Sequence, residues 1–147
     1  MNFFEGILEN SVFWVAFWAW FAAQFIKVIT YFFQEGKLNI YRMIGSGGMP
    51  SSHSSFVMGL STAVGLTHGW DSGLFAVAIV ISLIVMYDAS GVRRAVGKQA
   101  IIINNMIDDL YHHKPITNER LKELVGHTPV EVFAGAVLGI VMANIML

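Results

Sequence analysis

The sequence of 147 residues contains no cysteine. Disulfide bonds, thiolate metal ligands and a cysteine nucleophile are therefore excluded. Charged residues are also scarce, at 13%, and a net charge of −1 provides none of the basic surface that binds nucleic acid. Hydrophobic residues, by contrast, make up 55% of the chain. This composition leaves too little polar surface to coat a soluble globule, and it indicates a protein that resides in a membrane.

The hydrophobic residues are concentrated in long runs, and a helix needs about 20 such residues to cross a bilayer. Residues 12–33 meet this length, while 72–87 and 130–147 lie near the lower limit. A shorter segment, 54–66, is rich in Ser, Gly and Ala, which suits a helix packed among other helices. We therefore expect an all-α bundle of about four transmembrane helices, forming one membrane-embedded domain over residues 1–147.

Basic residues between the expected spans all lie on one side of the membrane. None lies between the second and third spans, whereas the other two loops contain Lys37, Arg42, Arg93, Arg94, Lys98, Lys114, Arg120 and Lys122. By the positive-inside rule this side is the cytoplasm, so both termini are expected outside a bacterial-type plasma membrane. The N-terminal region lacks the basic segment and cleavage site of a secretory signal, so we expect the first span to be retained.

The segment 92–127, between the third and fourth spans, is the one sizeable polar part of the sequence. Apolar residues recur there at helical spacing, at Val96, Ala100, Ile103, Ile107 and Leu110. This pattern predicts an amphipathic helix at the membrane interface, followed by a short helix over 117–126. We expect the whole segment to lie over the cytoplasmic mouth of the bundle.

Two histidines, His53 and His127, begin the second and fourth expected spans. On the four-span topology both lie at the cytoplasmic surface. The cationic residues expected near them are Lys27, Arg42, Arg93 and Arg94. Several fixed cations at one surface predict a phosphate site, because they stabilise the charge that gathers on the phosphate oxygens during transfer.

The spacing of polar residues around the two histidines suggests a role for each. Glu131 follows His127 by four residues, one helical turn, so its carboxylate can accept the second ring proton while His127 attacks phosphorus. His53 is then the general acid that protonates the departing alkoxide. Ser51 and Ser52 can add hydrogen-bond donors where the second span begins, at a helix N-terminus that favours anions.

Each of these residues also has a purely structural interpretation. Thr128 and Glu131 form a capping-box pattern with proline between them, which alone accounts for the glutamate. Lys27 can extend to the interface or pair with Asp88, and the two arginines can serve as topology anchors. The Asp and His residues of 108–113 have metal-ligand spacing, but a solvated helix face explains them better, so we predict no metal site.

Two segments resemble a known family. Pro-Ser-Ser-His at 50–53 resembles the Pro-Ser-Gly-His motif of the type 2 phosphatidic acid phosphatases, and 127–135 resembles their His-x-Pro-x-Asp-Val-x-x-Gly motif. The similarity is greatest to a divergent branch described as acid phosphatase/vanadium-dependent haloperoxidase-related. There, Gly-Gly-Met-Pro-Ser-Ser-His and Asp-Ala-x-Gly-Val-Arg-Arg recur, here as 47–53 and 88–94. The likeness covers most of the chain.

The resemblance implies a phosphohistidine-forming His127, an acid at His53 and a phosphate-binding arginine at Arg93 or Arg94. Lys27 and Arg42 are the nearest matches to the Lys and Arg of the family's first motif. The sequence departs from the family in having Glu131 for Asp and Ser52 for Gly. It also has four expected spans rather than six, and the segment 92–127 separates the arginines from the third-motif histidine.

These observations predict a metal-independent phosphatase without a cofactor, acting at the cytoplasmic leaflet. Its substrate is expected to be a lipid phosphomonoester or an isoprenyl phosphate or diphosphate, with membrane lipids as its surroundings and no nucleic acid as partner. The alternatives are a non-catalytic carrier of lipid phosphates and a structural membrane protein. The Gly-x-x-x-Gly motif at 135–139 is compatible with a homo-oligomer.

Overall fold

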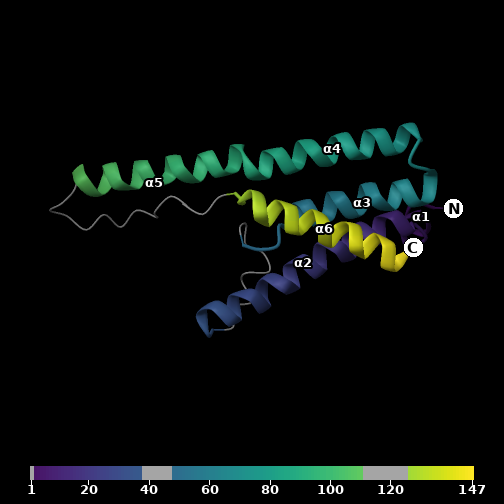
Figure 1. The fold of residues 1–147 in the computed structure, drawn as a ribbon, viewed down its shortest axis with the longest axis horizontal. Helices are drawn as coiled ribbons and strands as arrows, with labels where there is room; N and C mark the ends of the chain where they lie inside the picture. Colours follow the sequence, from purple (N-terminus) through teal and green to yellow (C-terminus); the bar gives the residue numbers. More distant parts are fainter. Residues whose placement is uncertain (1, 38–47, 111–125) are drawn as a thin grey trace.

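The computed structural model describes residues 2–37, 48–110 and 126–147. The described residues form α-helices and no β-strand, which confirms the all-α fold (Figure 1). In chain order the helices are α1 (Phe3–Leu8), α2 (Ser11–Glu35), α3 (Ser52–His68), α4 (Gly73–Ser90), α5 (Val92–Leu110) and α6 (Pro129–Met146).

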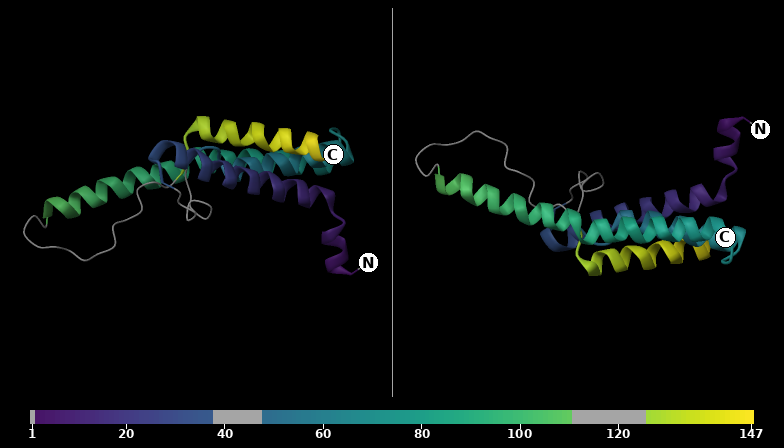
Figure 2. Two further views of the ribbon diagram at one scale, coloured as in Figure 1. Left: turned by 90° about the horizontal axis from the view of Figure 1, so that it is seen from below. Right: turned by 90° about the horizontal axis from the view of Figure 1, so that it is seen from above.

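Helix α3 occupies the middle of the bundle, where it contacts α2, α4 and α6. These four helices lie side by side, as the views in Figure 2 also show. Both chain termini and the turn between α3 and α4 lie at one end of the bundle. The starts of α3 and α6 and the end of α4 lie towards the other end (Figure 1).

The ends of the helices follow from local sequence. Asn10, Ser51, Ser72 and Thr128 are the N-caps of α2, α3, α4 and α6, and each side chain accepts a hydrogen bond from a backbone N–H in the first turn. At the other end of α2, Gly36 adopts a φ of 66°, a left-handed conformation that glycine tolerates best.

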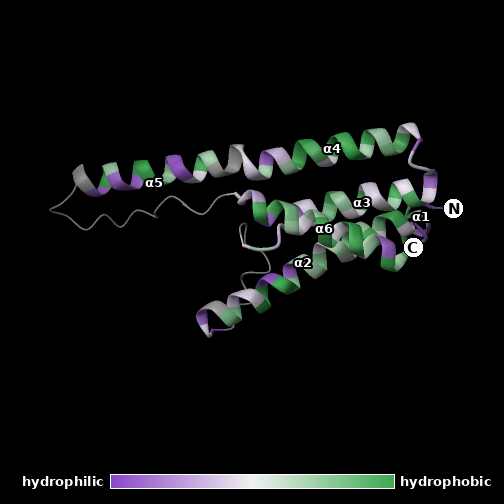
Figure 3. Ribbon diagram, in the orientation of Figure 1, coloured by the Kyte–Doolittle hydropathy of each residue, from purple (hydrophilic) through white to green (hydrophobic). Residues whose placement is uncertain are grey.

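Three stretches of the described chain are long and apolar enough to cross a membrane: Ser11–Phe33, Gly73–Asp108, which begins with α4, and Pro129–Met146. The apolar character of α4, of α6 and of most of α2 is visible in Figure 3. The sequence predicts four spans. The fourth corresponds to α3, which has 17 residues, a length of about 26 Å at 1.5 Å per residue. A membrane-crossing role for α3 therefore stays a prediction.

The bundle has small and polar residues inside and large apolar residues outside. The buried polar side chains include those of Gln24, Lys27, Ser51, Ser52, Ser54, Ser55, Ser61, Thr62, Ser82 and His127. Large side chains such as Phe25, Ile84 and Phe133 are more than half exposed. This arrangement is the reverse of a soluble core, and it suits helices that face lipid and contact each other through small residues.

The close approach of α3 and α6 depends on two glycines. A Cβ atom at Gly135 would collide with the backbone oxygen of Ser51, and one at Gly139 with that of Ser55. The Gly-x-x-x-Gly motif is therefore used within the chain, between α6 and α3. A homo-oligomer stays a prediction without this support.

Helix α5 does not cover the bundle as the sequence analysis predicted. It continues past the end of α4 and projects beyond the other helices (Figures 1 and 2), and among the described helices it packs mainly against α4. Only Gly91 separates the two helices, which leaves too short a connection for the chain to reverse direction. The second predicted helix, 117–126, lies outside the described residues.

Candidate functional site

His127 and Glu131 are brought together by the start of α6. The Glu131 carboxylate accepts a hydrogen bond from the Thr128 N–H at 2.9 Å, completing the predicted capping box. The same oxygen, Oε2, lies 3.1 Å from His127 Nδ1. Glu131 Oε2 therefore contacts both the helix cap and the His127 ring, as the separation of four residues predicts.

The contact with Glu131 defines the chemistry of the His127 ring. A carboxylate at Nδ1 favours the tautomer that carries its proton there, so the lone pair of the neutral ring is on Nε2. The His127 side chain is 2% exposed, and its rotation is therefore restricted. The ring is held in one orientation, as a nucleophile requires.

Two backbone hydrogen bonds fix the ends of three helices around His127. The His127 N–H donates to the Ala89 carbonyl at 2.9 Å, which joins the start of α6 to the end of α4. The Ser51 N–H donates to the Glu131 carbonyl at 2.9 Å, which joins the start of α3 to α6. Neither bond could be predicted from the sequence, because each connects residues distant along the chain.

His53 lies in the first turn of α3 and faces His127 across this junction. The centroids of the two rings are 6.0 Å apart, and the ring planes are inclined at 63°. The sequence analysis predicted that these two histidines meet, and the structure brings them together. At this separation both rings can contact one tetrahedral anion.

Lys27 reaches the same junction from α2. Its side chain is 4% exposed, and the ammonium group donates a hydrogen bond to Ser52 Oγ at 3.1 Å. Glu131 is the carboxylate whose negative charge acts on this ammonium. A buried cation within a membrane helix needs such partners. The sequence predicts Asp88 as an acidic partner of Lys27, and this pairing stays a prediction.

The remaining predicted phosphate ligands are only partly covered by the structure. Arg42 lies outside the described residues. Arg93 and Arg94 belong to the first turn of α5, shortly after Ala89, but their side chains lie outside the described part of the chain. Both arginines therefore follow Ala89 within a few residues, and the Ala89 carbonyl accepts the hydrogen bond from the His127 N–H.

The grouped side chains suit an anion better than a metal ion. Lys27 and Ser52 present N–H and O–H groups. The N–H groups of Ser52 and His53 are in the first turn of α3, where backbone donors have no acceptor within the helix. Among residues 2–37, 48–110 and 126–147, no three His, Asp or Glu side chains are grouped as metal ligands.

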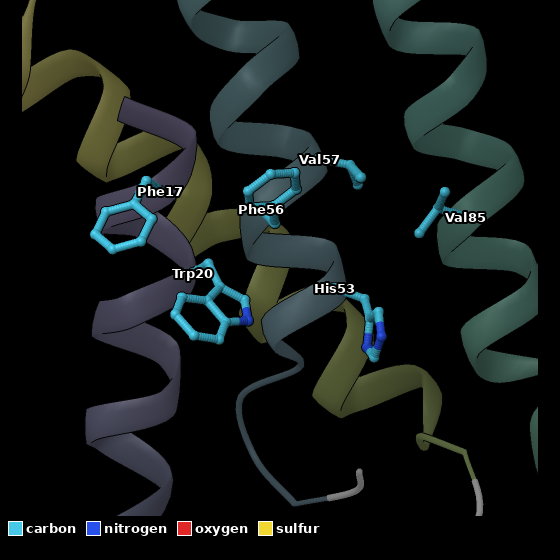
Figure 4. A pocket seen from close by; sticks show the side chains of 6 residues that line it. All are labelled: Phe17, Trp20, His53, Phe56, Val57 and Val85. Carbon is cyan, nitrogen blue, oxygen red and sulfur yellow. The ribbon is translucent and has the colours of Figure 1, made fainter. Parts of the chain in front are cut away.

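An apolar pocket that the sequence analysis missed adjoins His53. It has a volume of about 330 Å³ and is lined by Phe17, Trp20, His53, Phe56, Val57 and Val85. These residues come from α2, α3 and α4 (Figure 4). Trp20 is one of the two residues that α2 contributes to the lining. Its position three residues after Phe17, on one face of α2, was the available signal.

Comparison with known proteins gives two matches. The family model described as the divergent PAP2 family matches residues 8–142. The uncharacterized membrane protein YuiD of Bacillus subtilis (strain 168) is 42% identical over 135 residues, a region that covers 84% of this chain and 85% of that protein. No solved structure matches the chain.

Proposed function

Because this chain belongs to the divergent PAP2 family, we propose that it is an integral membrane phosphatase that removes phosphate from a lipid through a covalent phosphohistidine. The observation that carries this proposal is the pairing of His127 with His53, at a ring-centroid distance of 6.0 Å, while Glu131 contacts His127 Nδ1. A phosphoryl transfer through histidine needs one neutral imidazole that attacks and a second, protonated one that donates.

In the first step His127 Nε2 attacks phosphorus, and the bond between phosphorus and the lipid oxygen breaks. His53, as imidazolium, donates its proton to that oxygen, so the lipid leaves as an alcohol. In the second step the neutral His53 accepts a proton from water as the water oxygen attacks phosphorus. The bond between Nε2 and phosphorus breaks, inorganic phosphate leaves, and both histidines return to their starting states.

The remaining residues of the site stabilise charge on the transferring group. The Lys27 ammonium and the Ser52 hydroxyl are held together by their hydrogen bond and supply a cation and a donor. Because the ammonium already donates to Ser52 Oγ, the hydroxyl hydrogen is directed to another acceptor, here a phosphate oxygen. Arg42, Arg93 and Arg94 complete the proposed phosphate-binding set, at the cytoplasmic leaflet.

The proposal is tested by measuring phosphate release from phosphatidic acid, isoprenyl phosphate and isoprenyl diphosphate with the purified chain in lipid bilayers. Release that vanadate inhibits supports the phosphatase, because vanadate adopts the five-coordinate geometry of phosphorus in the transition state. Tight binding of a lipid phosphate without release supports the alternative, a non-catalytic carrier. A chain that neither binds nor hydrolyses contradicts both functions.

Replacing Lys27 with methionine is expected to lower kcat/KM for the lipid phosphate by about 10- to 100-fold, in part through a higher KM. The reason is that one fixed cation is lost from a partly dry site. The folded protein should be as stable as the native chain or more so, because a buried charge is replaced by an apolar side chain of similar volume. Steady-state kinetics and thermal unfolding measure the two effects separately.

The matched control for this change is Lys98→Met, on the exposed surface of α5. It should leave both kinetics and unfolding unchanged. Unaltered kinetics in Lys27→Met would remove Lys27 from the phosphate site and support its role as a structural group only.

Exchanging Glu131 for glutamine is expected to reduce kcat by about 100-fold or more, because an amide does not favour the Nδ1-protonated tautomer as a carboxylate does. The amide oxygen can still accept the Thr128 N–H, so the helix cap and the melting temperature should change little. Glu9→Gln, at the other end of the bundle, is the control. If Glu131→Gln lowered the melting temperature, and activity fell only because the protein unfolded, Glu131 would serve only as a cap.

A further inference from the structure

The pocket beside His53 is formed by residues of three helices, α2, α3 and α4. Phe17 and Trp20 extend from α2, Phe56 and Val57 from α3, and Val85 points from α4 towards α3 (Figure 4). Among the described residues that line the pocket, His53 is the one ionisable residue. Trp20 is 36% exposed, so the pocket is not sealed from the outer surface of the bundle. A hydrocarbon chain suits such a lining, and a solvated headgroup does not.

His53 belongs both to this pocket and to the histidine pair. In the proposed reaction His53 protonates the oxygen that links phosphorus to the lipid. The lipid's first carbon atoms extend from that oxygen, and the space next to His53 on the side of α2 and α4 is the apolar pocket. The geometry of the site therefore directs the start of the lipid chain into the pocket.

A second apolar pocket, of about 370 Å³, lies between α2, the residues before α3, and α6. Its lining residues are Ile26, Thr30, Met49, Pro50, Ala134, Val137, Leu138 and Val141. Neither histidine of the pair lines it. The first pocket therefore adjoins the lipid oxygen beside His53 directly, whereas the second pocket is separated from that oxygen.

We propose that the pocket formed by α2, α3 and α4 binds the first part of a single apolar chain, and that the substrate is a lipid phosphate with one chain attached directly to the phosphate oxygen. This inference rests on the proposed function. A volume of about 330 Å³ is at the small end of ligand pockets. It accommodates one alkyl or isoprenyl chain, whereas the glycerol of a diacyl lipid divides into two chains close to the phosphate.

The proposal predicts that Val85→Phe, which fills the pocket from α4, lowers kcat/KM for isoprenyl phosphate by at least about tenfold relative to propyl phosphate. Propyl phosphate places the same phosphate in the site with almost no chain. Val80→Phe is the matched control, because Val80 is on the same helix, 53% exposed and outside the pocket lining. Both rates are measured in bilayers of one composition.

A second measurement does not require turnover. Trp20 lines the pocket, so an isoprenyl phosphate analogue brominated near the phosphate should quench its fluorescence more than the corresponding brominated alcohol does. The excess quenching should disappear in Trp20→Phe and fall in Val85→Phe. It should persist in Val137→Phe, which fills the second pocket.

The outcomes separate this inference from the proposed function. Excess quenching without phosphate release would contradict the phosphatase and support chain binding. Phosphate release with an unchanged substrate ratio in Val85→Phe would overturn the chain site while the phosphatase stands. The chain site would also be overturned if Val137→Phe selectively lowered kcat/KM for isoprenyl phosphate relative to propyl phosphate. Hydrolysis of diacyl phosphatidic acid as fast as that of isoprenyl phosphate would overturn it too.

Discussion

Replacing His127 with alanine is expected to lower phosphate release by at least about a thousandfold, because the attacking atom itself is removed and no covalent intermediate can form. The native chain, mixed rapidly with a lipid phosphate carrying labelled phosphorus and then quenched, should retain the label on protein in an acid-labile form. His127→Ala should retain none. Rapid-quench labelling and steady-state release therefore give two independent measurements of the same role.

His68→Ala is the matched control for this experiment. His68 lies in the last turn of α3 and is exposed, whereas His127 is buried at the opposite end of the bundle. Its replacement should leave both labelling and release unchanged. Label that persists in His127→Ala, with release near the native rate, would exclude His127 as the nucleophile even if the chain proved to be a phosphatase.

A valine at Gly139 is expected to lower the free energy of unfolding by about 2–3 kcal/mol, because α3 and α6 are already in backbone contact there. A Cβ atom would meet the Ser55 carbonyl oxygen and would lie 2.7 Å from the Gly59 nitrogen. Both are backbone atoms of a continuous helix, so they can move only if α3 moves. Because α3 also carries His53 and Ser52, activity should fall together with stability.

Gly73→Ala provides the comparison. Gly73 begins α4, and a Cβ atom added there would have no neighbour within 4 Å. Thermal unfolding in detergent, followed by tryptophan fluorescence, should give a melting temperature equal to the native one for Gly73→Ala and a lower one for Gly139→Val. Equal melting temperatures in the two variants would mean that α3 and α6 are not packed as closely as described here.

The sequence by itself determined the features that depend on neighbouring residues. The long apolar runs established a helical membrane protein, and the start of α6 followed from Thr128, Pro129 and Glu131. The proximity of Glu131 to His127 was equally predictable, because a separation of four residues is about one turn of helix in any fold. For this reason Glu131 was recognised as both a cap and a partner of the histidine.

The two family motifs and the expected topology predict that His53 and His127 form a pair. The relative position and orientation of their rings could not be predicted. The rings meet because Gly135 and Gly139 let α6 approach α3 at Ser51 and Ser55, which sets the rotation and the axial position of both helices. Hydropathy contains no information on rotation.

Only the tertiary structure decided the course of α5, the use of the Gly-x-x-x-Gly motif within the chain and the presence of the pocket beside His53. The course of α5 depends on how little chain separates it from α4, whereas the use of the motif and the pocket depend on which faces of distant segments come into contact. In a membrane, apolar faces have little preference between lipid and protein, so helix contacts are chosen by close packing of small residues and by buried hydrogen bonds. Such contacts, like that of Lys27 with Ser52, are properties of the assembled bundle and not of any one segment.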